Sequence, residues 1–212
     1  TNLNSELIVA TRPFSDQAEA FRSIRSHLIM KMYSDEGPRH ALAVLSPESG
    51  DGKSFFAANL AVAFSQLPGR TLLIDADMRS PRLHELFSVE YRGGGLSAVL
   101  SGRAATNVIQ SVPDLNNLFL LPVGGTPPNP LELLERPAFE LLIRELRTKF
   151  DRIIVDTPAA SCGADSAVVA AKCGAALLLA RRNHSSVEAM QTLLGTVSMG
   201  STRVVGTILN EY

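Results

Sequence analysis

The sequence contains few residues of the kinds that mark secreted, nucleic-acid-binding or membrane-spanning proteins. Its 2 cysteines, Cys162 and Cys173, have neither the number nor the spacing of a disulfide framework or a metal site. We expect both to be buried, reduced thiols of a cytosolic protein. With 20 basic and 21 acidic residues, and no basic block with interleaved aromatics, nucleic acid is a poor candidate partner. The most apolar stretch, residues 164–180, is interrupted by Lys172 and Gly174 and is too short and alanine-rich to span a bilayer.

Three further features limit the interpretation of the chain. No signal peptide is evident. The chain starts at Thr1 and not at Met, which is the start expected of a processed or excised piece. The histidines, which are His27, His40, His84 and His184, show no ligand spacing and no nucleophile partner, so we assign them no chemistry. The 212 residues are 45% apolar and contain no stretch that looks like a linker. We therefore expect a single domain over residues 1–212.

The segment from Ser46 to Ser54, SPESGDGKS, is typical of a phosphate-binding loop. It follows the apolar run 41–45 and opens a helical segment. Gly50 and Gly52 allow successive N–H groups to turn toward an anion at the helix N-terminus. Lys53 would then reach the β- and γ-phosphates, and the Ser54 hydroxyl would bind Mg²⁺. Pro47 replaces the first glycine of G-x-x-x-x-G-K-[ST], but the surrounding strand and helix favour nucleotide binding over a chance glycine turn.

Acidic residues follow two apolar strands that show no alternation. Asp75 and Asp77 come after residues 71–74, and Asp156 comes after residues 152–155. The carboxyl ends of parallel strands are where open α/β sheets place their ligand chemistry. We favour a metal-site role for Asp75 and Asp77 over the alternative, a helix N-cap before Pro81. Asp156 fits a carboxylate that orients Mg²⁺ or water.

Strands and helices alternate along most of the chain, which predicts right-handed βαβ crossovers. The expected fold class is α/β, with a mainly parallel central sheet and helices on both faces. Residues 1–14 are predicted to be an extended lead-in. The strands are expected at about 40–45, 71–74, 118–121, 152–155, 175–179 and 204–209, and the helices at about 17–32, 53–67, 96–100, 130–149, 164–172 and 186–197. Asn210 ends the last strand, where it either contacts a nucleotide base or simply terminates the strand.

A candidate oligomerisation helix covers residues 15–33. Its apolar residues recur on one face, and Glu19, Arg22 and Arg25 form a row on the other. Such a row is either an ordinary solvated face or a surface that docks another protein. Periodicity alone favours the solvated face.

These segments together resemble the bacterial protein-tyrosine kinases of capsule and exopolysaccharide production, which are P-loop proteins related in fold to partition and septum-site ATPases. The resemblance covers nearly the whole chain. The similar segments are residues 19–25 (E-x-x-R-x-x-R), 46–54 (Walker A), 72–84 (Walker A′), the proline-rich loop 121–134, and 150–158 (Walker B).

The resemblance implies an ATP- and Mg²⁺-dependent tyrosine kinase that regulates polysaccharide chain length and export. Lys53 would neutralise charge on the transferred phosphoryl group, and Asp75 would orient or deprotonate the tyrosine hydroxyl, with Asp77 as a third catalytic residue. The Mg²⁺ ligands would be Ser54, Asp77 and Asp156. The nucleotide would be bound by Ser49, Gly50, Asp51, Gly52, Lys53, Ser54, Phe55 and Asn210.

The resemblance also implies partners. Glu19, Arg22 and Arg25 would mediate contacts in a ring of subunits, and a membrane-embedded chain-length or export protein would supply an activating cytoplasmic segment. The chain would therefore lie in the cytoplasm at the inner face of the membrane.

Two departures from the family pattern matter. The chain ends at Tyr212 with only Tyr33 and Tyr91 elsewhere, whereas family members usually end in a tyrosine cluster. Phe55 stands where a hydroxyl residue is usual, which we expect to weaken nucleotide binding by about 1 kcal/mol. One alternative is an ATP-binding assembly partner of the export machinery that phosphorylates no tyrosine. Another is a partition or septum-site positioning ATPase, but such proteins carry an extra lysine early in the loop, and residues 46–49 contain none.

Overall fold

The structure is a computed structural model that describes residues 3–33, 41–90, 94–103 and 106–211. The predicted break at residues 37–38, His40, Tyr91 and Tyr212 lie outside the described residues. None of the described helices is both long and apolar enough to cross a membrane.

The strands of the described chain form one seven-stranded sheet in the order β3-β4-β2-β5-β1-β6-β7. Every neighbouring pair is parallel except β3 with β4, which confirms the predicted mainly parallel sheet. The strands are β1 (Ala41–Leu45), β2 (Thr71–Asp75), β3 (Gln110–Ser111), β4 (Leu118–Leu121), β5 (Arg152–Asp156), β6 (Gly174–Arg181) and β7 (Arg203–Asn210). Of these strands, only β3 was missing from the sequence prediction, because a strand of two residues has no periodic pattern.

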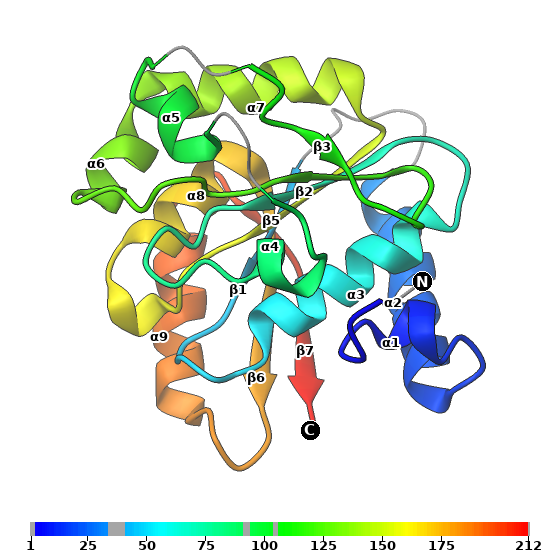
Figure 1. Cartoon of the computed structure of the whole chain (residues 1–212). Coiled ribbons are helices and arrows are strands. Elements are labelled where there is room, and N and C mark those ends of the chain that lie inside the picture. The colour runs from blue at the N-terminus through cyan, green and yellow to red at the C-terminus, as the bar shows by residue number, and fades with distance from the viewer. Residues whose placement is uncertain (1–2, 34–40, 91–93, 104–105, 212) are drawn as a thin grey trace.

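Helices cover both faces of the sheet, as predicted, with α2 and α3 on one side and α8 and α9 on the other (Figure 1). The helices are α1 (Ile8–Thr11), α2 (Asp16–Met32), α3 (Lys53–Ser65), α4 (Leu83–Leu86), α5 (Leu96–Leu100), α6 (Pro130–Glu135), α7 (Pro137–Lys149), the 3-10 turn η1 (Ala160–Cys162), α8 (Asp165–Cys173) and α9 (Val187–Ser198).

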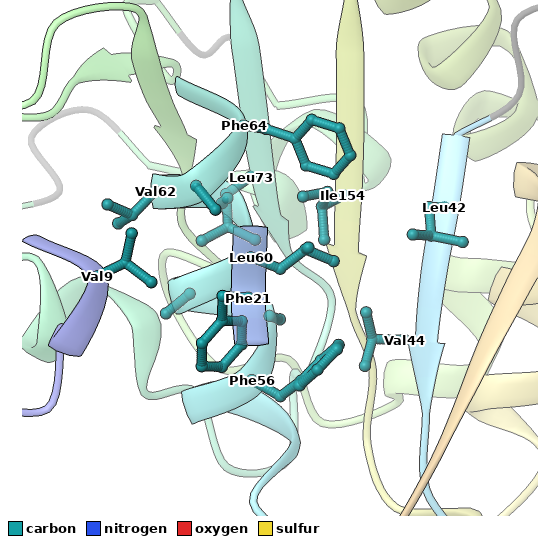
Figure 2. Close-up of a cluster of buried hydrophobic side chains, with 14 of the residues drawn as sticks. Val9, Phe21, Leu42, Val44, Phe56, Leu60, Val62, Phe64, Leu73 and Ile154 are labelled. Atoms are coloured by element: carbon teal, nitrogen blue, oxygen red, sulfur yellow. The ribbon is translucent and has the colours of Figure 1, made fainter. Parts of the chain in front are cut away.

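Alternate residues of the buried strands point to opposite faces, so the sheet separates two apolar cores. Leu42 and Val44 of β1 belong to the core with α1, α2 and α3, where they lie on the same side as Phe56 and Phe64 (Figure 2). The intervening residue Ala43 belongs to the core under α5–α9. Burial on both faces explains why these strands show no polar alternation.

The N-terminal segment differs from the prediction of an extended lead-in, because it contains α1 and packs against α3. Leu7 and Val9 are fully buried. The buried Asn59 side chain of α3 accepts from the Val9 N–H (3.1 Å) and donates to the Glu6 carbonyl (2.9 Å). These paired polar groups allow the segment to bury its backbone at low cost. Sequence periodicity missed it because α1 is only one turn long.

The predicted helix over 130–149 was also wrong, since the chain forms two helices. Arg136 has extended backbone angles (φ −61°, ψ 145°) between α6 and α7. The ring of Pro137 disfavours helical angles at the residue before it, so the helix ends there and restarts at the proline. The prediction that both thiols are buried holds for Cys173, but Cys162 is exposed.

Candidate nucleotide-binding site

The loop between β1 and α3 has the backbone geometry of an anion site. Gly50 and Gly52 have φ of 85° and 87°, in the region that favours glycine. A Cβ atom at Gly52 would lie 2.6 Å from the Asn210 side-chain nitrogen. Within the described part of the chain, the N–H groups of residues 50–54 have no intramolecular acceptor. They are therefore available to an anion at the N-terminus of α3.

A cavity of about 520 Å³ opens above this loop. The predicted residues Ser49, Gly50, Asp51, Gly52, Lys53, Ser54, Phe55, Asn210 and Asp77 all line it. Other residues in its wall were not predicted, namely Glu6, Arg79, Arg82, Cys162 and Arg181. Asp75 and Asp156 lie behind this wall and are fully buried.

Lys53, Ser54 and Asp156 meet at the start of α3 and the end of β5. The Lys53 Nζ lies 3.6 Å from Asp156 Oδ1. The Ser54 hydroxyl donates to Asp156 Oδ2 (2.5 Å). Asp156 Oδ1 is buried and has no hydrogen-bond donor in the described structure. Lys53 is thus near enough to pair with this oxygen by charge but makes no hydrogen bond to it, so the oxygen could still bind a metal cation.

The oxygen donors beside the loop fit Mg²⁺. A serine hydroxyl and one or two carboxylates are its usual protein ligands in phosphate sites, and nucleotide phosphates and water complete the set. The described residues contain no group of three or more acidic, histidine or cysteine side chains able to hold a metal alone. The assignment of Ser54, Asp77 and Asp156 as Mg²⁺ ligands therefore stays a prediction.

Asp75 and Asp77 occupy different environments although only one residue separates them. Asp75 accepts the N–H groups of Asp77 (3.1 Å), Arg82 (3.2 Å) and Leu83 (3.2 Å). Asp77 Oδ1 accepts those of Arg79 (3.2 Å) and Ser80 (3.0 Å) while the side chain lines the cavity. Asp77 therefore lines the cavity and also stabilises its own turn, while its metal role stays a prediction. The alternative considered from sequence, a helix N-cap before Pro81, is wrong, because the helix begins only at Leu83, with Arg82 as its N-cap and no side-chain capping bond.

Burial and neighbouring negative charges raise the pKa values of the two buried carboxylates. Asp75 and Asp156 are register partners on adjacent strands. The pKa of Asp75 is raised well above its usual value, first by burial and next by the charge of Asp156. Burial also raises the pKa of Asp156, although Lys53 and the Ser54 hydroxyl oppose that shift. A cation near Asp156 would relieve this repulsion.

The loop after β6 contacts the phosphate-binding loop, and sequence reasoning missed it. Asp51 Oδ1 accepts from His184 Nδ1 (2.8 Å) and from the Ser185 hydroxyl (2.5 Å). Arg181 donates to the Gly50 carbonyl (2.9 Å), and Asn210 donates to the Asp51 carbonyl (3.2 Å). No spacing signal predicts these contacts, because they arise only where β6 lies beside β1 in the sheet.

Two ion pairs tie neighbouring segments to the cavity wall. Arg82 donates to both carboxylate oxygens of Glu6 (2.8 and 2.7 Å), which joins the N-terminal segment to the loop after β2. Arg79 makes a bidentate pair with the buried Asp165 of α8 (3.0 Å for each bond). The loop after β2 is therefore held to the N-terminal segment and to α8 beside the cavity.

The row Glu19, Arg22 and Arg25 is not simply solvated. Arg22 donates to Glu19 (3.2 Å) and to the Pro13 carbonyl (2.6 Å). Arg25 donates to the Ala63 carbonyl in the last turn of α3 (2.6 Å). Both arginines therefore also stabilise their own subunit, and their contact with a second subunit stays a prediction.

The loop, its lysine and serine, and the acidic strand ends define a P-loop nucleotide-binding domain. In agreement, residues 42–212 match the family described as the CobQ/CobB/MinD/ParA nucleotide binding domain. The chain is 31% identical to the putative tyrosine-protein kinase CapB of Staphylococcus aureus over 208 residues, covering 98% of this chain and 90% of that protein. It is also 34% identical to the tyrosine-protein kinase wzc of Salmonella typhi over 207 residues, covering 98% of this chain.

A solved structure gives the same result. The kinase domain of the Escherichia coli tyrosine kinase ETK matches with a TM-score of 0.91 at 30% identity, covering 99% of this chain and 81% of that one. The chain therefore belongs to the bacterial tyrosine-protein kinases, within the CobQ/CobB/MinD/ParA nucleotide-binding family. It spans 28% of the length of wzc.

Proposed function

We propose that this chain is an ATP- and Mg²⁺-dependent protein-tyrosine kinase that acts in exopolysaccharide or capsule production. The observation that carries the proposal is the cluster of Lys53, Ser54 and Asp156 at the N-terminus of α3, beside free loop N–H groups and Asp77. Phosphoryl transfer needs positioning and charge stabilisation more than covalent chemistry. This cluster provides both.

In the proposed reaction the tyrosine oxygen forms a bond to the γ-phosphorus, the bond from that phosphorus to the ADP oxygen breaks, and the tyrosine loses its proton. The loop N–H groups hold the phosphates, and Lys53 stabilises the negative charge on the transferred group. Ser54, Asp77 and Asp156 would hold Mg²⁺, which when bound offsets phosphate charge.

Asp75 is the proposed proton acceptor. Its raised pKa suits a base, because a carboxylate of ordinary pKa accepts a proton poorly near neutral pH. In this structure its oxygens face backbone N–H groups behind the cavity wall. Hydrogen bonds of catalytic groups commonly rearrange in the complex with substrate. The proposal therefore requires the loop from Asp75 to Arg82 to shift when the acceptor binds.

The proposal extends to the surroundings of the domain. A membrane-embedded chain-length or export protein would provide an activating cytoplasmic segment, and the chain would act in the cytoplasm at the inner face of the membrane. Self-association, as a ring in which Glu19, Arg22 and Arg25 contact a neighbour, would bring one subunit's tyrosine to another's cavity. The support for these partners is the family membership.

The test is phosphotyrosine formation with Mg-ATP, detected with antibody and mass spectrometry, with and without a cytoplasmic segment of the partner. Lys53→Met and Asp77→Asn should abolish the signal, whereas the matched variants Lys149→Met and Asp114→Asn, which change exposed residues, should retain it. Mass spectrometry would identify the acceptor among Tyr33, Tyr91 and Tyr212. Hydrolysis of ATP without labelled tyrosine, even on an added tyrosine peptide, would favour an assembly ATPase instead.

A further inference from the structure

The Asp51 carboxylate is unusual because it lies within a loop that receives anions. It is located between the two left-handed glycines, Gly50 and Gly52, and its side chain is fully buried. A buried carboxylate needs a donor for each oxygen, or it costs several kcal/mol. Here Oδ2 accepts the Glu48 N–H (2.9 Å), and Oδ1 accepts from two residues of the loop after β6.

The chemistry of these contacts identifies the donors. An ionised carboxylate only accepts, so His184 Nδ1 carries the proton in its 2.8 Å contact with Asp51. The Ser185 hydroxyl donates to the same oxygen (2.5 Å) and accepts the Arg181 N–H (2.7 Å), which orients it. Hydrogen bonds to a charged group are stronger than neutral ones.

Two further side-chain contacts hold the loop backbone. The Arg181 guanidinium donates to the Gly50 carbonyl (2.9 Å), and the Asn210 side chain donates to the Asp51 carbonyl (3.2 Å). The His184 ring also lies against Gly50, where an added Cβ would be 3.6 Å from its Cε1 and Nε2 atoms. Both carbonyls are thus engaged by side chains, while the N–H groups of residues 50–54 have no acceptor within the described part of the chain.

We propose that His184 is a positioning residue for nucleotide binding, which acts through the Asp51 carboxylate to hold the phosphate-binding loop in the conformation that receives the phosphates. The inference rests on the proposed function, since it concerns the same nucleotide site. The histidine touches no reacting atom. Its contribution is preorganisation, which lowers the ordering cost that the nucleotide would otherwise meet.

The experiment compares the dissociation constant for Mg-ADP, by calorimetry, in the wild type, His184→Ala and His184→Asn. The asparagine amide can donate a hydrogen bond from nearly the position of Nδ1. This variant therefore distinguishes loss of the hydrogen bond from loss of side-chain volume. We expect His184→Ala to bind about tenfold more weakly, as for loss of a hydrogen bond to a charged group, and His184→Asn to recover most of that loss. His27→Ala, which changes an exposed histidine of α2, should bind like the wild type.

Two further measurements distinguish positioning from a general structural role. In kinase assays His184→Ala should raise the KM for ATP by a similar factor while kcat changes much less. In an Asp51→Ala background the His184→Ala change should have no further effect on the dissociation constant, because its partner is gone. Melting curves without nucleotide check that the variants fold.

Three results would overturn the inference: wild-type affinity in His184→Ala, an asparagine variant as weak as the alanine variant, or an undiminished effect without Asp51. The outcome for the kinase proposal is separate. A wild-type chain that binds Mg-ADP but never forms phosphotyrosine would end that proposal and leave the His184 comparison intact. A wild type that binds no nucleotide would overturn both.

Discussion

Replacing Lys53 by methionine should destabilise the domain even before any nucleotide is added. The Lys53 Nζ lies 3.6 Å from Asp156 Oδ1, and the two side chains are only 8% and 1% exposed. At that separation two unit charges attract by about 4 to 5 kcal/mol for an effective dielectric constant of 20. Breaking a buried pair costs about 3 to 5 kcal/mol, because the remaining charge has no counterion. Ser54 still donates to Asp156, so we expect a loss of about 3 kcal/mol in the free energy of unfolding.

The loss should depend on pH in a defined direction. Burial raises the pKa of Asp156, and Lys53 opposes this shift. Without Lys53 the pKa rises further, so the folded variant holds a proton that the unfolded chain has already released. Stability of the variant then falls as pH rises from the ordinary carboxyl range through the raised pKa of the folded state. The deficit relative to the wild type should therefore be larger at pH 8 than at pH 5.

Urea unfolding followed by circular dichroism, without nucleotide, measures this effect. Lys149→Met is the matched control, because Lys149 forms an exposed pair with Glu145 on α7 and should contribute little. In an Asp156→Asn background, Lys53→Met should cost much less than in the wild type. The reasoning is refuted if Lys53→Met is as stable as the wild type at pH 8, or if its cost is unchanged when Asp156 is neutralised.

The cysteines, Asp75 and Arg25 should each respond measurably to their surroundings. Cys162 is exposed and lines the cavity, whereas burial raises the pKa of Cys173 to about 12. Only the Cys162 thiol should therefore react with maleimide in the native protein, and Mg-ATP should slow that reaction. Mass spectrometry can follow both effects. Burial and the charge of Asp156 raise the pKa of Asp75. The free energy of unfolding of the wild type, measured in urea, should therefore decline as pH rises above the ordinary carboxyl range, and the decline should be less steep in Asp156→Asn. A free energy of unfolding that does not change with pH would contradict this. Arg25→Ala should cost about 1 kcal/mol through its lost bond to the Ala63 carbonyl, an effect that persists at dilutions where size-exclusion chromatography shows monomers.

The sequence by itself was sufficient for the fold class and for the residues at the centre of the candidate site. Strands buried on both faces read as unbroken apolar runs, so β1, β2 and β5 were predicted to within a residue or two. The loop residues from Ser49 to Phe55 were predicted because phosphate binding uses adjacent backbone groups, which leaves a local pattern in the chain. All of them line the cavity.

Only the tertiary structure decided which distant side chains surround that loop. The contact of His184 with Asp51 spans 133 residues, and the pair of Arg82 with Glu6 spans 76. Such contacts depend on strand order and on the docking of α1 against α3, and neither leaves a periodic signal in the residues involved. Burial of Asp75 behind the cavity wall is likewise a property of three dimensions, because its raised pKa comes from desolvation and from Asp156 on the neighbouring strand. The order of residues along the chain therefore specifies the phosphate-binding loop. Packing between distant segments determines which charged and polar side chains contact that loop.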